Sequence, residues 1–193
     1  MRFVPPGRED PYYEISVYES GRVATRPESL HDWFNALAWL AFPRTKARIN
    51  ALHAREMPRG GKGRRGPLRD LLTIFDEGGA IVVCADDELL ALLRSAAWKT
   101  LFGENRDRVR KEMKIIVFGH AVQEQALEPR PGITCKAMVL PGGDLDAGAA
   151  RWLADAPADA SPRALLPVPV FGYPGWYPAQ DATFYEDKRY FRP

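Results

Sequence analysis

The sequence predicts an α+β fold, in which a single domain has two β-hairpins and a further strand packed on about four helices. The length of 193 residues is typical of one domain, and a hydrophobic share of 46% is enough for a core. Stretches with the apolar spacing of helices are interspersed with short β-branched runs. Neither GxGxxG nor GxxxxGK(S/T) occurs, so Rossmann and P-loop folds lack their main support.

The first hairpin is predicted close to the N-terminus. Residues 12–19 alternate between apolar and polar side chains in the manner of a strand. Ser20-Gly21 is typical of a tight turn, and residues 22–25 supply the returning strand. This hairpin opens the predicted domain.

Two helices follow the first hairpin. Ser29 and Asp32 have the spacing of a capping box, and Pro43 ends the first helix. Its apolar stripe, which predicts a deeply buried helix, consists of Leu30, Trp33, Phe34, Leu37, Leu40 and Ala41. The second helix is predicted over residues 45–56, with one apolar face turned inward.

The middle of the chain predicts a loop, a second hairpin and a long helix. Residues 57–67, MPRGGKGRRGP, break all regularity and indicate a basic mobile loop. LLTIF and AIVVC flank a Gly-rich DEGG turn within residues 71–84 and predict the hairpin, although a helix that begins at Leu68 is an open alternative. Asp86 caps the next helix, whose apolar stripe extends to Leu101.

The last third predicts a helix, a strand, a short helix and an extended segment. Within residues 109–127, IIVF favours a strand, but the apolar spacing favours a helix with Gly119 as its weak point, and we expect the helix. A strand is predicted over residues 133–140 and a helix over residues 144–154. Residues 157–193 form an extended segment rich in proline and aromatic side chains, which we expect to wrap around its own domain.

Composition limits the class of protein. No apolar run approaches the roughly 18 residues of a membrane helix, and the first residues do not resemble a signal peptide. We therefore expect a cytoplasmic protein without a membrane partner. Cys84 and Cys135 are far apart, which excludes a disulfide framework and a zinc ribbon. The net charge of +2 indicates no particular partner.

Four segments resemble an uncharacterised bacterial family, a domain of unknown function. They are HDWFNALAWLAFPRTKARINALH (residues 31–53), LTIFDEGGAIVVCADDELLALL (72–93), FGHAVQEQALEPRPGIT (118–134) and the terminal YFRP (190–193). Together they span most of the chain. The resemblance implies no reaction, cofactor or catalytic residue, so the chemistry must be inferred from individual side chains.

Polar residues on apolar helix faces are the candidate catalytic residues. His31 and Asn35 share one face of the first helix, and Asp32 follows His31. His120 and Glu124 stand one turn apart on an apolar stripe, where a carboxylate needs a partner and the imidazole can provide it. The candidate catalytic set is therefore His31, Asp32, Asn35, His120 and Glu124.

The three histidines, His31, His53 and His120, are the candidate metal ligands. The helix dipole keeps His31 neutral, and a neutral imidazole can ligate a metal or act as a base. Convergence of these rings would hold a divalent metal that activates water, which predicts a metal-assisted or acid/base hydrolase. The alternative is that each ring is separately hydrogen-bonded in the core, because no HExxH, HxH or ExxH pair places two ligands on one element.

A binding module is the alternative function. Residues 44–69 contain nine Lys or Arg and one acid, whereas residues 70–88 contain six acids and no Lys or Arg. The two segments could simply attract each other. Alternatively, the basic segment binds a phosphate-bearing ligand or the backbone of a nucleic acid. The predicted anion-binding residues are Arg44, Arg48, Arg55, Arg64 and Arg65.

Overall fold

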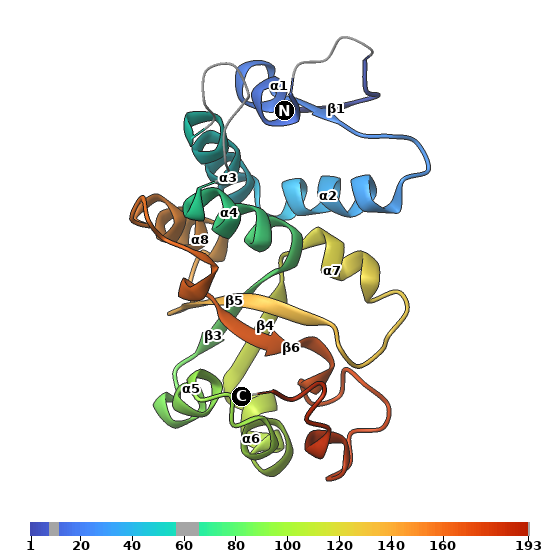
Figure 1. Ribbon diagram of the computed structural model, residues 1–193, viewed down its shortest axis with the longest axis vertical. Coiled ribbons are helices and arrows are strands. Elements are labelled where there is room, and N and C mark those ends of the chain that lie inside the picture. Colours follow the sequence, from blue (N-terminus) through green and yellow to red (C-terminus); the bar gives the residue numbers. More distant parts are fainter. Residues whose placement is uncertain (8–11, 57–65, 193) are drawn as a thin grey trace.

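A four-stranded sheet lies across the middle of the molecule in the computed structural model, which describes residues 1–7, 12–56 and 66–192 (Figure 1). Its strands stand in the order β4 (Met113–Val117), β3 (Gly79–Cys84), β5 (Thr134–Leu140) and β6 (Leu166–Pro169). β3 is parallel to β5, and the other neighbours are antiparallel. With helices packed around this sheet, the predicted α+β class is confirmed.

Both faces of the sheet are covered, which explains the continuous apolar run of β3. Ala80 and Val82 enter one core, and Ile81 enters the other. One layer of helices consists of α3 (Pro43–Glu56), α4 (Pro67–Gly78) and α8 (Leu145–Ala154). The opposite layer consists of α5 (Asp87–Arg94), a π-helix (Lys99–Glu104), α6 (Arg106–Glu112) and part of the C-terminal segment.

The N-terminal elements lie against the first layer (Figure 1). β1 (Arg2–Val4) pairs in parallel with β2 (Arg22–Ala24), and α1 (Tyr13–Ser20) lies between them in the chain. The hairpin predicted over residues 12–25 is therefore wrong. Gly21 has a φ of 66°, and its N–H donates to the carbonyl of Val17, so it ends a helix instead of turning a hairpin.

α2 (Leu30–Ala41) has the predicted bounds but is not deeply buried. The Ser29 hydroxyl accepts the N–H of Asp32 at its start. Trp39 is buried, whereas Trp33 is 58% and Leu40 67% exposed. The neighbouring helices α3 and α7 (His120–Gln125) cover only part of the apolar stripe, and the rest remains in solvent.

Residues 67–78 form α4, so the second predicted hairpin is wrong and the open alternative of a helix near Leu68 is confirmed. The deciding signal is a helical stripe of buried side chains: Leu68, Leu71, Leu72 and Phe75. Pro67 is the first residue of this helix, a position where a missing N–H is tolerated. Most of the predicted loop, residues 57–65, lies outside the described part of the chain.

Two predicted helices are shorter than expected. α5 ends before Leu101 because Ala96 takes a positive φ of 52°, and the separate π-helix follows. Within residues 109–127, the centre forms β4, because β-branched side chains suit a strand and the backbone pairs with β3. Helix α7 begins only after Gly119.

Three further elements, α3, α8 and β5, lie where the sequence predicts them. Asp144 caps α8 by accepting the N–H of Ala147. No helix in the described ranges combines the length and the apolarity that a membrane crossing requires.

The C-terminal segment covers one side of the core without a long helix. Tyr185, Tyr190 and Phe191 are buried in the core shared with β3 and α5. The hydroxyl of Tyr190 accepts the N–H of Phe171 and donates to the carbonyl of Ile133, at 2.9 Å in both cases. The segment thus wraps around its own domain, as its aromatic content predicts.

Candidate metal centre

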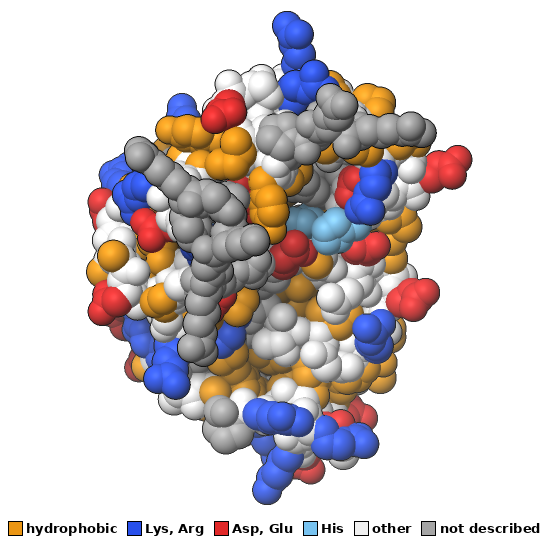
Figure 2. All heavy atoms as spheres, turned by 45° about the horizontal axis from the view of Figure 1, so that its top comes forward, with side chains coloured by type: hydrophobic (Ala, Val, Ile, Leu, Met, Phe, Trp, Pro, Cys, Tyr) orange, Lys and Arg blue, Asp and Glu red, His pale blue; other side chains and the backbone are white. Residues whose placement is uncertain are grey.

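Three helix ends meet beside a cavity of about 420 Å³ on one side of the sheet. The first turn of α2 carries His31, the end of α4 carries Glu77, and the first residue of α7 is His120. Figure 2 shows histidine side chains in a hollow flanked by acidic side chains. The fold therefore joins polar residues from three distant parts of the sequence.

Glycines allow α4 and α7 to approach closely at this point. The N–H groups of Phe118 and Gly119 both donate to the carbonyl of Gly79, at 2.9 and 2.8 Å. A Cβ on Gly119 would lie 2.5 Å from the carbonyl oxygen of Glu77, so a larger residue does not fit. The DEGG and FGH segments thus hold Glu77 and His120 at a fixed separation.

Three potential ligand atoms converge at the mouth of the cavity. The Nε2 atoms of His31 and His120 are 3.1 Å apart. The Oε2 atom of Glu77 lies 3.4 Å from Nε2 of His120 and 3.9 Å from Nε2 of His31. Ligands of a tetrahedral zinc ion, with bonds of about 2.0–2.1 Å, are roughly 3.3–3.4 Å apart. Small adjustments would place all three atoms around one cation.

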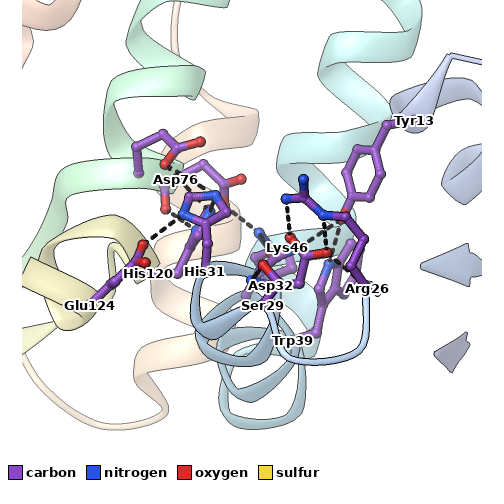
Figure 3. A network of polar contacts seen from close by, with 12 residues as sticks. Tyr13, Arg26, Ser29, His31, Asp32, Trp39, Lys46, Asp76, His120 and Glu124 are labelled. Atoms are coloured by element: carbon purple, nitrogen blue, oxygen red, sulfur yellow. Dashed lines mark hydrogen bonds and ion pairs between the residues drawn. The ribbon is translucent and has the colours of Figure 1, made fainter. Parts of the chain in front are cut away.

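Hydrogen bonds at the other ring nitrogens assign the tautomers of both imidazoles (Figure 3). Nδ1 of His120 lies 2.8 Å from the backbone oxygen of Asp76, and Nδ1 of His31 lies 3.1 Å from Oε2 of Glu124. Because a carbonyl and a carboxylate only accept, both Nδ1 atoms carry hydrogen. In the neutral rings, the bare Nε2 lone pairs then face each other, and a cation between them relieves their repulsion.

Burial and charge also favour a cation. The side chain of His120 is 4% exposed, and burial lowers its pKa, which keeps the ring neutral and able to ligate. The described side chains that line the cavity include four carboxylates and the cationic groups of Arg26 and Lys46. A divalent ion would balance this excess of two negative charges.

Two of the three predicted metal ligands, His31 and His120, lie in this cluster, and Glu77 is its third member. His53 is buried and lines the same cavity but lies outside the cluster. Glu124 does not form the expected pair with His120, because its carboxylate reaches across to His31 on α2. Glu124 therefore orients the ring of His31.

Asp32 has a structural partner instead of a place beside the imidazoles. Its carboxylate accepts the backbone N–H of Arg26 at 2.7 Å and two guanidinium N–H groups at 2.9 Å. The hydrogen bonds from Arg26 lower the pKa of Asp32 to about 2. Figure 3 places Asp32 with Arg26 and Ser29, apart from the histidines.

Asn35 lies at the centre of a second polar group in the same cavity. Its Nδ2 donates to the hydroxyl of Tyr13 at 3.0 Å, and its Oδ1 accepts from Nζ of Lys46 at 2.7 Å. Lys46 is buried and also pairs with Asp76 at 2.5 Å. Since Asp76 also bonds His120 through its carbonyl, it connects this group to the candidate metal centre.

The predicted anion-binding arginines do not form one described cluster. Arg44 pairs with Asp144 at 2.8 Å, and Arg55 with Glu56 at 3.2 Å. Arg44 and Arg48 line the same groove between α3 and α8, whereas Arg55 does not line it. The remaining two, Arg64 and Arg65, lie outside the described residues. Phosphate or nucleic-acid binding by this segment stays a prediction from the sequence.

Four residues beside this cavity are not among the predicted site residues: Glu77, Asp76, Lys46 and Tyr13. Glu77 and Asp76 belong to the DEGG segment, whose sequence is typical of a hairpin turn. The helical stripe that ends at Phe75 was the available signal, because it places both acids at the end of a helix. For the buried lysine and the tyrosine, the sequence offers no comparable signal.

The sequence model of the family described as "Protein of unknown function (DUF3025)" matches residues 1–193. No curated protein and no solved structure matches the chain.

Proposed function

Since the chain belongs to the DUF3025 family, whose function is unknown, we propose from its geometry that it is a metal-dependent hydrolase. His31, Glu77 and His120 hold a divalent cation, and the cation activates water for hydrolysis. Glu124 and the carbonyl of Asp76 orient the two imidazoles from behind.

The opposed Nε2 atoms of His31 and His120 carry this proposal. They are 3.1 Å apart, and each ring already uses its Nδ1–H on an oxygen acceptor. Two core histidines without a shared ligand would be expected to turn a nitrogen with hydrogen toward an acceptor. A carboxylate–histidine–metal arrangement explains both the facing nitrogens and the acceptors behind them.

The chemistry follows from the open side of the site. Three protein ligands leave a fourth tetrahedral position for water, and the exposed fractions of the Glu77 and His31 side chains, 44% and 38%, show that solvent reaches it. A bound zinc ion would lower the pKa of this water to about 7. The water oxygen would then bond to the electrophilic carbon of the substrate, the bond to the leaving group would break, and the proton lost by the water would go to the leaving atom.

Metal titration tests the proposal. Metal-free protein should bind one Zn²⁺ per chain in isothermal titration calorimetry, and elemental analysis of the purified protein should show which of zinc, manganese and iron it carries. His31→Ala and His120→Ala should each weaken zinc binding at least about 100-fold, because two remaining ligands hold zinc poorly. His53→Ala is the matched control, since His53 lines the cavity outside the ligand cluster, and it should retain full affinity.

A folded protein that contains no metal and takes up neither zinc, manganese nor iron would refute the site. If the metal binds, hydrolysis of p-nitrophenyl acetate and of a matched anilide should stop on chelation and return with the metal. Turnover that persists after chelation and in His120→Ala would contradict a metal-dependent reaction.

A further inference from the structure

The second polar group of the cavity has hydrogen-bond donors in excess of its acceptors. It consists of Tyr13, Asn35 and Lys46, which line the same cavity as the candidate metal ligands. The side chains come from α1, α2 and α3, so three helices place them together. Figure 3 shows Tyr13 and Lys46 near each other in this network.

The orientation of Asn35 follows from its neighbours. Nζ of Lys46 is only a donor, so the contact of 2.7 Å requires the amide oxygen of Asn35 on that side. The amide nitrogen must then face Tyr13, whose hydroxyl oxygen accepts at 3.0 Å. The donors and acceptors around Asn35 thus fix the orientation of its amide.

The hydroxyl group of Tyr13 consequently has a hydrogen that these contacts do not use. Its oxygen accepts from Asn35 and from the indole Nε1–H of Trp39, at 3.0 and 3.4 Å. Both lone pairs are used, so the hydroxyl hydrogen must be donated elsewhere. Among the residues that the structure describes, none accepts it. The tyrosine is partly buried beside the cavity, and burial raises its pKa, so it stays protonated at neutral pH.

Lys46 has the same imbalance. Two of its three N–H groups are used by Asn35 and Asp76. Nζ also lies over the ring of Trp39, 5.4 Å from its centroid, which is a cation–π contact and not a conventional hydrogen bond. No third oxygen acceptor for Nζ is found within the described part of the chain, although the side chain is buried.

Two donors in one cavity select a ligand group that accepts hydrogen bonds. The charge of the cavity determines whether this acceptor is charged or uncharged. Lys46 is already paired with Asp76, and a divalent ion would only balance the charge of the remaining carboxylates. A phosphate dianion would therefore restore an uncompensated charge. An uncharged carbonyl oxygen accepts both donors without that cost. The volume of about 420 Å³ suits a small organic molecule.

We infer that Tyr13 and Lys46 form a subsite that binds the carbonyl oxygen of an uncharged amide or ester within the cavity. The claim that this carbonyl compound is a substrate rests on the proposed function of the metal centre. The claim that the carbonyl compound binds at Tyr13 and Lys46 does not depend on that function. The substrates of the proposed hydrolase would then be amides or esters and not phosphate esters.

Three probes that share a ring and differ in charge test the subsite: benzamide, benzoate and phenyl phosphate. The indole resonance of Trp39 reports on binding, because its N–H donates to the hydroxyl that would contact the ligand. It can be assigned among the five tryptophans by Trp39→Phe. We expect benzamide to bind most tightly, to both zinc-loaded and metal-free protein. Tyr13→Phe should weaken it about 3- to 10-fold and Lys46→Met at least about 10-fold.

Matched controls separate the subsite from general effects. Tyr18→Phe changes an exposed tyrosine of the same helix, and Lys99→Met changes an exposed lysine, so both should leave benzamide binding unchanged. If Lys46→Met does not fold because Asp76 loses its partner, the double variant Lys46→Met with Asp76→Asn replaces it. Tyr13→Phe remains decisive in either case.

The outcomes also separate this inference from the proposed function. Zinc titration of Tyr13→Phe should match that of the unaltered protein. Benzamide binding that depends on Tyr13 in a protein that binds no metal would support the subsite and refute the metal centre. Tighter binding of benzoate or phenyl phosphate, or benzamide binding unchanged in Tyr13→Phe, would overturn the inference.

Discussion

Asp32 illustrates how the hydrogen bonds of one carboxylate can stabilise the fold. Arg26 holds the pKa of Asp32 at about 2, below its ordinary value of 3.8. Since the folded-state pKa is depressed, the stabilisation is complete above pH 3.8 and is lost as the pH falls toward 2. Solvent screening of the exposed Arg26 limits it to about 1–2 kcal/mol.

Asp32→Asn should therefore lower the free energy of unfolding by about 1–2 kcal/mol at pH 7. Urea denaturation of both proteins at pH 7, 5 and 3 measures the difference, which should shrink at the lowest pH. Zinc affinity should not change, because Asp32 lies outside the ligand cluster. A difference that stays constant over this range would show that the ion pair is not its source.

Glu124 is the residue whose role in the proposed centre is most easily isolated. Its carboxylate accepts the Nδ1–H of His31 and so orients that ring. Glu124→Gln keeps the size and should weaken zinc binding about 10- to 100-fold, as measured by competition with a chromophoric chelator. Gln125→Glu is a control on the same helix at an exposed position. Unchanged zinc affinity in Glu124→Gln would remove Glu124 from the centre.

At the level of single residues, the sequence predicts the histidines better than their partners. His31 and His120 stand out because imidazoles on apolar helix faces need polar partners, and that reasoning holds for any fold. Glu77 is one acid among six in residues 70–88, and nothing local distinguishes it. Its importance arises only when α4 ends beside α7, which is a long-range contact.

At the level of elements, glycine decides how closely α4 and α7 approach. A Cβ on Gly119 would lie 2.5–2.6 Å from three backbone atoms of residues 77–79, and backbone cannot move aside as a flexible side chain can. Gly119→Ala should destabilise the protein by about 1–3 kcal/mol and weaken zinc binding at least about 10-fold. Thermal unfolding and zinc titration measure these two effects.

Gly78→Ala provides the comparison at the same close approach of α4 and α7. Its added Cβ would meet only a methyl of Val122, at an ordinary distance of 3.7 Å. Alanine also favours the end of α4, so stability should stay within about 0.5 kcal/mol of the original. Equal losses of stability in Gly78→Ala and Gly119→Ala would mean that the close approach of α4 and α7 depends on the flexibility of glycine and not on the space that a Cβ would fill.

The elements that the sequence predicts correctly have strong local signals. α2 has a capping serine and a terminating proline, and α8 has a capping aspartate. The prediction for α1 is wrong because its sequence also fits a strand. The prediction for β4 is wrong because its apolar residues also fit a helix. In β4, pairing with β3 determines the outcome, and a single sequence does not display that pairing.

At the level of the whole molecule, the C-terminal segment completes the core on the side of the sheet opposite to the proposed metal centre. Removal of residues 173–193 would expose the cavity left by Tyr185, Tyr190 and Phe191. Each buried aromatic side chain contributes about 3–5 kcal/mol, so their joint loss matches the whole stability of a typical domain. The truncated chain should aggregate, and a folded monomer in size-exclusion chromatography would show that the segment is a detachable arm.

Removal of a single hydroxyl group is a milder test of how the C-terminal segment is held on the core. Tyr190 connects the end of the chain to Ile133, directly before β5, and to Phe171, shortly after β6, because its hydroxyl donates to the carbonyl of Ile133 and accepts the N–H of Phe171. Tyr190→Phe leaves the buried N–H of Phe171 without its partner, whereas the carbonyl of Ile133 keeps the N–H of Val170. The variant should cost about 1–3 kcal/mol in urea denaturation. Glu186→Gln, which removes only an exposed ion pair with Lys99, should cost clearly less than Tyr190→Phe. If the two variants lose the same stability, the hydroxyl does not hold the segment, and its aromatic rings alone do so.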